Sequence, residues 1–300
     1  MASSWHDPQS GPWSTLAGGT NAHCNICRWE GAAFDGPAHC EGARCPQCGS
    51  IARDRFLFWA LRVAVAQPAA GTAPLRVLET SPRLDGRYRR AMGDWFDYLC
   101  SDFDERAHAG TVQLDLQDIA LPSESFDVVL SAHVLEHVPD TDAALRELYR
   151  ILAPGGTLLL QVPVLQERTA VPARPEFHGD NTPVAWRFGP DLSDRLAAAG
   201  FEVHLLATDE LLACAVAAPD AAARPWGPAV SPEFDVEALL RGLRRDTGGT
   251  GGTGPISAEL RAELQGVADA AAAARHGFQP AYMFLTWACV KPGEQRSATG

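Results

Sequence analysis

Residues 126–138 read FDVVLSAHVLEHV and residues 145–156 read LRELYRILAPGG, and these two segments indicate the fold class. Residues 128–130 are apolar without interruption, which is typical of a parallel strand buried on both faces. Ser131 and His133 then bring polar side chains to the point where this strand ends. Open α/β sheets bind their ligands at that edge, so the pattern predicts a site there.

A helix and a second strand follow. Leu145, Leu148, Tyr149 and Leu152 recur at helical spacing, and the Pro-Gly-Gly of 154–156 is expected to stop the helix. The apolar run that begins at residue 157 predicts the next strand, which completes a strand–helix–strand unit.

The same alternation extends over most of the chain. We expect strands near 75–79, 96–101, 111–115, 126–131, 157–163 and 201–207, with a last strand at 281–290. Helical patterns lie between several of them. Alternating strands and helices predict an α/β fold with a doubly wound, mostly parallel sheet.

The rest of the chain divides by composition. Residues 1–20 are rich in Ser, Gly and Pro and are expected to be a disordered tail. We expect a cysteine-bearing module with a connecting helix at 21–65, the α/β domain at 74–292, and a tail at 293–300. A helical insertion or lid at 209–279 precedes the last strand. It carries Trp226 and Phe234, which are consistent with an aromatic pocket, a dimer contact or ordinary helical packing.

The charge and hydropathy of the chain indicate which kinds of partner it is unsuited to bind. The chain has 300 residues, a formal net charge of −12, and Lys291 as its one lysine. This acidic balance disfavours nucleic acid and anionic membranes, which bind clustered cations. The sequence also lacks a signal-peptide pattern and a membrane-spanning apolar run, so we expect a cytoplasmic protein.

Two cysteine pairs predict a metal site. Cys24 and Cys27 form one C-x2-C pair, Cys45 and Cys48 form another, and seventeen residues separate the pairs. Four thiolates on two tight turns match a structural Zn²⁺ site, whereas disulfides need an oxidising compartment. Nearby arginines (Arg44, Arg53 and Arg55) are either ligands for an anionic substrate group or ordinary surface residues.

The central block quoted above resembles that of class I S-adenosylmethionine-dependent methyltransferases, in the branch called methyltransferase type 11. The resemblance covers roughly residues 74–208 and implies a Rossmann-like, seven-stranded sheet whose last strand, at 281–290, is antiparallel. It also implies S-adenosylmethionine as cofactor. The family has a glycine-rich turn after its first strand, whereas this chain reads Thr80-Ser81-Pro82 after the acidic Glu79. We interpret that turn as a variant of the cofactor site.

Further cofactor contacts are expected at the ends of the next strands. Asp102 ends the second strand, where an acidic side chain can accept the ribose hydroxyl hydrogens, although a turn or helix-cap aspartate is the alternative. The resemblance implies that Asp115 and Leu116 lie beside the adenine. His133 is expected to project toward the sulfonium side, and Ser131, at the end of the same strand, is expected to contact the cofactor.

Methyl transfer to a hydroxyl or amine requires removal of a proton, whereas a carboxylate acceptor needs no base. The candidate bases are His133 and His178, the latter in the loop after the fifth strand. We expect O-methylation of a small molecule or peptide of specialised metabolism. The alternatives are a zinc-ribbon-bearing RNA methyltransferase, which the absence of net positive charge in residues 1–63 disfavours, and a non-catalytic cofactor-binding protein.

Overall fold

The computed structural model describes residues 22–36, 44–65, 72–82, 84–104, 112–163, 168–178, 181–189, 191–206 and 286–293. The expected N-terminal tail, the insertion at 209–279 with Trp226 and Phe234, and nearly all of the C-terminal tail lie outside the described residues. Within the described part of the chain, no helix is both long enough and apolar enough to cross a bilayer.

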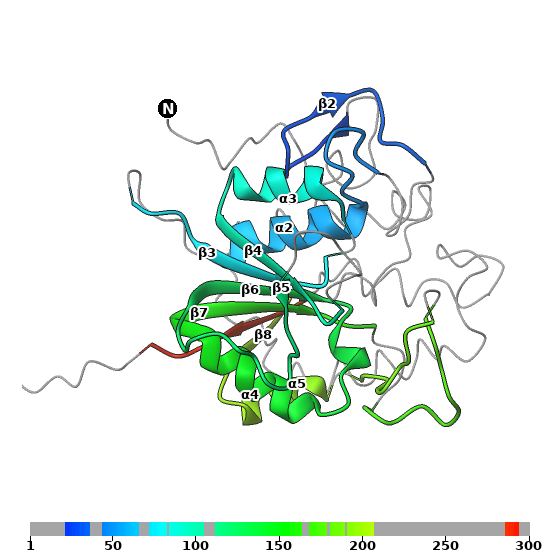
Figure 1. Cartoon of the computed structure of the whole chain (residues 1–300), viewed down its shortest axis with the longest axis vertical. Helices are drawn as coiled ribbons and strands as arrows, with labels where there is room; N and C mark the ends of the chain where they lie inside the picture. Colours follow the sequence, from blue (N-terminus) through cyan, green and yellow to red (C-terminus); the bar gives the residue numbers. More distant parts are fainter. Residues whose placement is uncertain are drawn as a thin grey trace, which may run out of the picture.

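A seven-stranded sheet forms the centre of the molecule (Figure 1). Its strands are β3 (Arg76–Thr80), β4 (Asp97–Asp102), β5 (Val112–Gln113), β6 (Phe126–Ala132), β7 (Leu152–Gln161), β8 (Glu202–Leu206) and β9 (Thr286–Val290). They lie in the order β5-β4-β3-β6-β7-β9-β8. Neighbouring strands from β5 through β7 are parallel, and β9 is antiparallel to both β7 and β8. The predicted doubly wound α/β fold with an antiparallel last strand is therefore confirmed.

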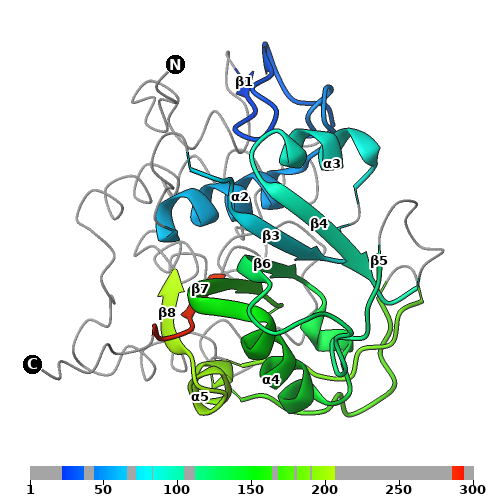
Figure 2. The same cartoon turned by 60° about the vertical axis from the view of Figure 1, so that its left-hand side comes forward.

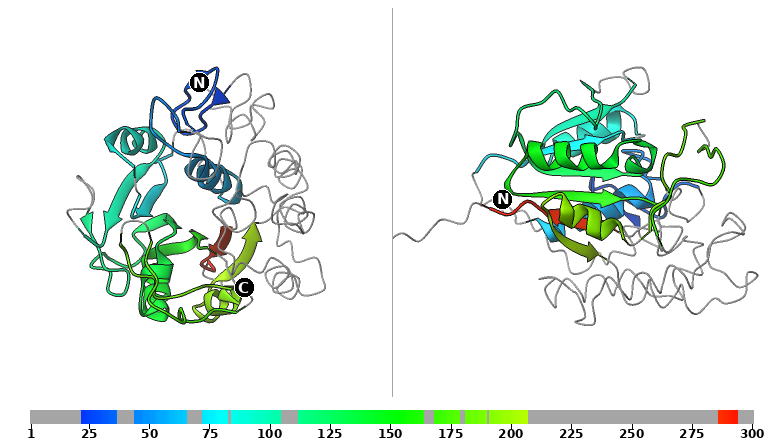
Figure 3. Two further views of the ribbon diagram at one scale, coloured as in Figure 1. Left: turned by 90° about the vertical axis from the view of Figure 1, so that its right-hand side faces the viewer. Right: turned by 90° about the horizontal axis from the view of Figure 1, so that it is seen from below.

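Helices cover both faces of the sheet. Helices α2 (Ala52–Ala64) and α3 (Gly86–Gly93) lie on one face, and α4 (Thr141–Ile151) and α5 (Leu192–Ala198) lie on the other (Figure 1). Two apolar clusters fill the layers. Val128 and Leu130 of β6 belong to the first cluster and Val129 to the second, as the alternation of side chains along a strand requires. Figure 3 shows β9, in red, between β7 and β8.

The boundaries of two predicted strands are wrong. β7 begins at Leu152 and not near 157, because the turn at 154–156 continues the pairing of the sheet. Gly155 has φ 79° and its N–H donates to the carbonyl of Lys291 at 2.8 Å, and the Lys291 N–H donates to the carbonyl of Gly156 at 2.9 Å. β5 is shorter than predicted and spans only 112–113.

The cysteine module packs against the face of the molecule that carries α2 and α3. Its short strands β1 (Ala22–His23) and β2 (Glu30–Gly31) lie beyond α2 and α3 (Figure 2). Cys24, Ile26 and Phe58 belong to the same apolar cluster as Val77 and Val128 of the central strands. The guanidinium of Arg28 lies 4.2 Å from the ring centroid of Trp95. Since these contacts join the module to the face that carries α3, the module is positioned to shape one wall of the site.

Candidate functional site

The carboxyl ends of the parallel strands open into a cavity of about 950 Å³. This edge includes the point between β3 and β6 where the strand order reverses, which is the usual ligand site of such sheets. Ligand pockets commonly measure about 300–1,000 Å³, so the cavity has room for a nucleotide-sized cofactor and part of a second ligand. The predicted cofactor residues that line it are Glu79, Thr80, Ser81, Pro82, Asp102, Asp115, Leu116 and His133.

The turn after β3 contains a residue with a positive φ angle, as glycine turns often do, but this residue is not a glycine. Ser81 has φ 47°, in the left-handed region that L residues rarely adopt. Its N–H donates to the carbonyl of Ser101 at 2.6 Å, and its hydroxyl donates to Asp102 at 2.8 Å. Beside it, the hydroxyls of Thr80 and Ser131 are 3.0 Å apart. Ser131 is fully buried, so it supports the turn from below.

Glu79 is held inside the protein at the start of this turn. Its carboxylate accepts hydrogen bonds from the hydroxyl of Tyr98 at 2.6 Å and from that of Tyr88 at 3.0 Å. Burial raises the pKa of Glu79 to about 7, although the two tyrosine hydrogen bonds act in the opposite direction. This carboxyl can therefore change its protonation state near neutral pH in response to a bound cation.

Asp102 and Asp115 occupy successive strand ends. Asp102 is 9% exposed, and its Oδ1 accepts from the N–H of Asp104 at 3.2 Å. Asp115 accepts from the N–H of Gln117 at 2.9 Å and from its side-chain amide at 3.1 Å. Both aspartates lie on the cavity wall, and their backbone positions are fixed by local hydrogen bonds.

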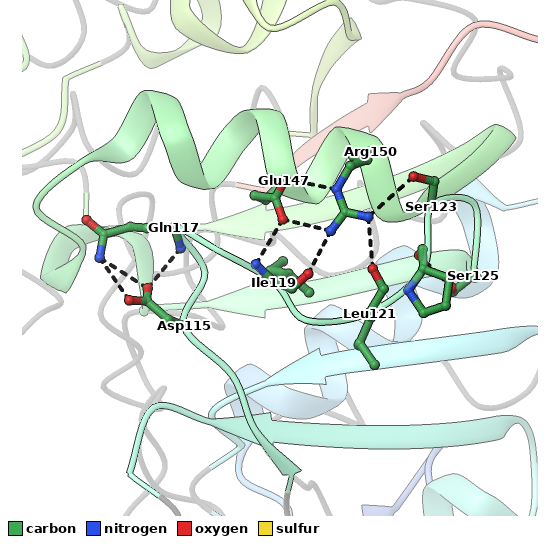
Figure 4. Close-up of polar contacts among 9 residues, drawn as sticks. Asp115, Gln117, Ile119, Leu121, Ser123, Ser125, Glu147 and Arg150 are labelled. Carbon is green, nitrogen blue, oxygen red and sulfur yellow. Dashed lines mark hydrogen bonds and ion pairs between the residues drawn. The ribbon is translucent and has the colours of Figure 1, made fainter.

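The loop that carries Asp115 is fastened to α4 (Figure 4). Arg150 donates to the carbonyl of Ile119 at 2.7 Å and to that of Leu121 at 2.8 Å. Glu147 accepts from the N–H of Ile119 at 2.8 Å and pairs with Arg150 at 2.7 Å. This network was not predicted from the sequence.

The two predicted bases have different surroundings. His133 lines the cavity directly after β6, with φ 57°, and its Nδ1 lies 3.8 Å from Oε1 of Glu136. His178 is not among the described residues that line the cavity. Its ring makes an edge contact with the ring of His137 at a centroid distance of 4.6 Å. His137 does line the cavity, and its Nε2, like Nδ1 of His133, lies 3.8 Å from Oε1 of Glu136.

The four predicted metal ligands come together. Sγ of Cys24 is 3.7 Å from that of Cys48, Sγ of Cys27 is 3.6 Å from that of Cys45, and all four sulfurs lie within 4.8 Å of one another. A disulfide would need about 2.05 Å. Four sulfurs around a tetrahedral Zn²⁺ at about 2.3 Å would be about 3.8 Å apart, so the arrangement fits zinc.

The module also contributes to the cavity. Arg44, Arg53 and Asp54 line it, and Arg53 is only 8% exposed. Arg55 is fully buried instead, with its guanidinium 2.6 Å from the carbonyl of Ser50, so this arginine supports the module internally. Arg187, outside the module, pairs with Glu176 at 2.7 Å.

Residues 89–160 match the family model described as the methyltransferase domain, which confirms the resemblance drawn from the central block. The match begins after the Thr80-Ser81-Pro82 turn. Among curated proteins, the chain is similar to the ubiquinone/menaquinone biosynthesis C-methyltransferase UbiE of Pseudoalteromonas translucida, with 47% identity over 49 residues, covering 16% of this chain and 20% of that protein. UbiE of Shewanella frigidimarina is 27% identical over 121 residues, covering 34% and 47%. The chain thus spans less than half the length of these relatives.

Solved structures of methyltransferases are also similar in part. An S-adenosylmethionine-dependent methyltransferase from Mesorhizobium loti is 19% identical with a TM-score of 0.38, covering 50% of this chain and 84% of that one. The 1,6-didemethyltoxoflavin-N1-methyltransferase of Burkholderia thailandensis, solved with S-adenosylhomocysteine, is 18% identical with a TM-score of 0.34, covering 44% and 62%.

Proposed function

We propose that this protein is an S-adenosylmethionine-dependent methyltransferase that methylates an oxygen atom of a small molecule or peptide. The observation that carries the proposal is the placement of Glu79, Asp102 and Asp115 at three successive strand ends around one cavity. Three carboxylates at this edge suit a ligand that carries a ribose, an amino group and a sulfonium charge. The family match supports the same assignment.

Different residues of the cavity bind different parts of the cofactor. The cofactor supplies an electrophilic methyl group on sulfur. Asp102 accepts hydrogen bonds from the ribose hydroxyls, and Asp115 with Leu116 holds the adenine. Glu79, whose pKa is raised to about 7, becomes ionised when the cationic end of the cofactor lies close to it.

His133 is placed to accept the acceptor's proton. It follows β6 directly and lines the cavity, with its Nδ1 3.8 Å from Oε1 of Glu136. His178 remains the alternative base, but it lies against His137 and reaches the acceptor less directly. Acceptor alignment and exclusion of water account for the remaining catalysis.

The cysteine cluster holds a structural Zn²⁺ in this proposal. Four protein ligands leave no coordination position for a substrate. The ion fixes the module that brings Arg44 and Arg53 to the cavity wall, where their positive charge suits an acceptor with an acidic group. The chain then acts on small acidic molecules more readily than on neutral ones.

Calorimetric titration with S-adenosylhomocysteine tests the cofactor site. We expect micromolar-range binding to the full-length protein and its loss in Asp102→Ala. Asp97→Ala is the matched control, because Asp97 begins the strand that Asp102 ends and its side chain is exposed. Absence of binding to the unsubstituted protein would overturn the proposal and leave a sheet that has lost its cofactor.

An acceptor screen with methyl-labelled cofactor tests the reaction. It should include phenols, because these offer both an oxygen and ring carbons, and the UbiE relatives are named as C-methyltransferases. Product analysis then distinguishes O-methylation from C-methylation. With a productive acceptor, we expect His133→Ala to lower kcat at least a hundredfold while leaving S-adenosylhomocysteine affinity nearly unchanged.

A further inference from the structure

Three metal-ligating side chains gather beside the cofactor cavity, away from the cysteine module. Glu136, His137 and His178 each offer one ligand atom, and these atoms lie within 4.8 Å of one another. Nε2 of His137 is 3.8 Å from Oε1 of Glu136. The side chain of Glu136 is 3% exposed and that of His137 is 14% exposed, so water screens this group poorly.

The tautomer of His137 suits a metal ligand. Its Nδ1 lies 2.7 Å from the carbonyl oxygen of Pro183, which can only accept a hydrogen bond. Nδ1 therefore carries the proton, and Nε2, which faces Glu136, presents a lone pair. Histidine ligands of protein metal sites are commonly oriented by a hydrogen bond of this kind from the other ring nitrogen.

Hydrogen bonds hold the segment that carries His178 next to Glu136. The N–H groups of Ala185 and Trp186 both donate to the carbonyl of Glu136, at 2.8 and 3.0 Å. The indole N–H of Trp186 donates to the carbonyl of Pro139 at 3.0 Å, and the N–H of His178 donates to Thr182 at 3.0 Å. These bonds bring His178 back over residues 135–139, so the three ligands are organised before any ion binds.

We propose that Glu136, His137 and His178 bind a divalent transition-metal ion at the edge of the cofactor cavity. Two imidazoles and one carboxylate favour Zn²⁺, Co²⁺, Ni²⁺ or Fe²⁺ over the harder Mg²⁺ and Ca²⁺. Ligand atoms around a tetrahedral ion at about 2.1 Å lie roughly 3.4 Å apart. Binding therefore needs atoms that now lie up to 4.8 Å apart to close by at most about 1.4 Å.

The position of the ion suits it to bind the acceptor. His137, Thr182 and Pro183 also line the cavity, so the ion lies where the acceptor would enter. Three protein ligands leave coordination positions for water or for an acceptor oxygen. The role of the ion in receiving the acceptor rests on the proposed methyltransferase function, whereas the metal site itself does not.

Cobalt binding tests the site without any acceptor. Full-length protein carrying one equivalent of zinc is titrated with Co²⁺ by calorimetry and visible absorption. We expect about one additional Co²⁺ per chain, with weak visible bands and without the intense sulfur-to-metal charge-transfer bands of a thiolate site. His178→Ala should weaken this binding at least tenfold. Its melting temperature and its affinity for S-adenosylhomocysteine should match those of the unsubstituted protein, which shows that it folds.

His204→Ala is the matched control. Nε2 of His204 lies 3.6 Å from Oε1 of Glu202, a similar histidine–carboxylate pair that belongs to no metal-binding group among the described residues. Cobalt binding should be unchanged in this variant. The proposal is overturned if no second equivalent binds, if binding persists in His178→Ala, or if the spectrum shows cobalt only at sulfur. None of these outcomes bears on cofactor binding, which is measured separately.

Discussion

The hydroxyl of Ser81 donates to Oδ2 of Asp102 at 2.8 Å from a backbone held at φ 47°. This bond joins the ends of β3 and β4 across the cofactor edge of the sheet. It orients the carboxylate of Asp102, which we propose binds the ribose. It also helps to hold Ser81 in a left-handed conformation that glycine adopts more easily. The left-handed conformation costs about 1–2 kcal/mol in a residue with a side chain, and the hydrogen bond to Asp102 offsets part of that cost.

Substitutions at Ser81 separate the strain from the hydrogen bond. Ser81→Ala keeps the unfavourable φ and loses the bond, whereas Ser81→Gly loses the bond and removes the strain. We expect the glycine variant to have a free energy of unfolding about 1 kcal/mol above that of the alanine variant, by urea denaturation. Glycine normally lowers stability relative to alanine, so the opposite order would show that φ at this position is relaxed.

The buried Glu79 should make stability depend on pH. Its pKa is raised from 4.5 to about 7 by burial, so between these values the folded protein holds a proton that the unfolded chain releases. The free energy of unfolding therefore falls as pH rises through this window. Relative to the unsubstituted protein, Glu79→Gln should gain about 3 kcal/mol between pH 4.5 and pH 8.

Urea denaturation at a series of pH values measures this gain. Taking the difference between the two proteins cancels the titration of every other group. A difference that does not vary with pH would mean that the carboxyl of Glu79 titrates near its ordinary pKa.

Removal of a zinc ligand should affect the whole domain. Cys24 shares an apolar cluster with Val77 and Val128 of the sheet, so loss of the ion disturbs packing beyond the module. We expect Cys48→Ser to retain less than half an equivalent of zinc by elemental analysis and to lower the melting temperature markedly. Cys289 lies in the strand β9 and is not one of the four zinc ligands, so Cys289→Ala should keep a full equivalent of zinc. Zinc content that falls equally in both variants would contradict the assignment.

The contact between α4 and the adenine loop should influence cofactor affinity. Arg150 holds the carbonyls of Ile119 and Leu121, so Arg150→Ala frees the loop that carries Asp115. We expect a three- to tenfold weaker affinity for S-adenosylhomocysteine, because ordering of the loop then accompanies binding. Arg146→Ala, an exposed arginine on the same helix, is the control and should bind normally. Equal affinities would show that the loop is ordered without Arg150.

Local patterns allowed much of the site to be predicted. Residues 128–130 alternate between the two apolar clusters, and polar residues appear where the strands end; both features depend only on neighbours in sequence. The two C-x2-C pairs indicated the four sulfurs now found within 4.8 Å, because each pair is its own turn. The exact start of β7 escaped prediction, since the pairing of Gly155 and Gly156 depends on Lys291, far along the chain.

Periodicity and short spacings along the chain encode the fold class, the clustering of the four cysteines and the carboxylates at the strand ends, so these features could be predicted from the sequence. The approach of Arg53 to the cavity, the left-handed backbone of Ser81 and the contact of His178 with His137 became visible only in the folded molecule. These relationships join segments that are distant in sequence or depend on a single backbone angle. Their physical cause is the packing of loops against the sheet edge, which no local pattern specifies.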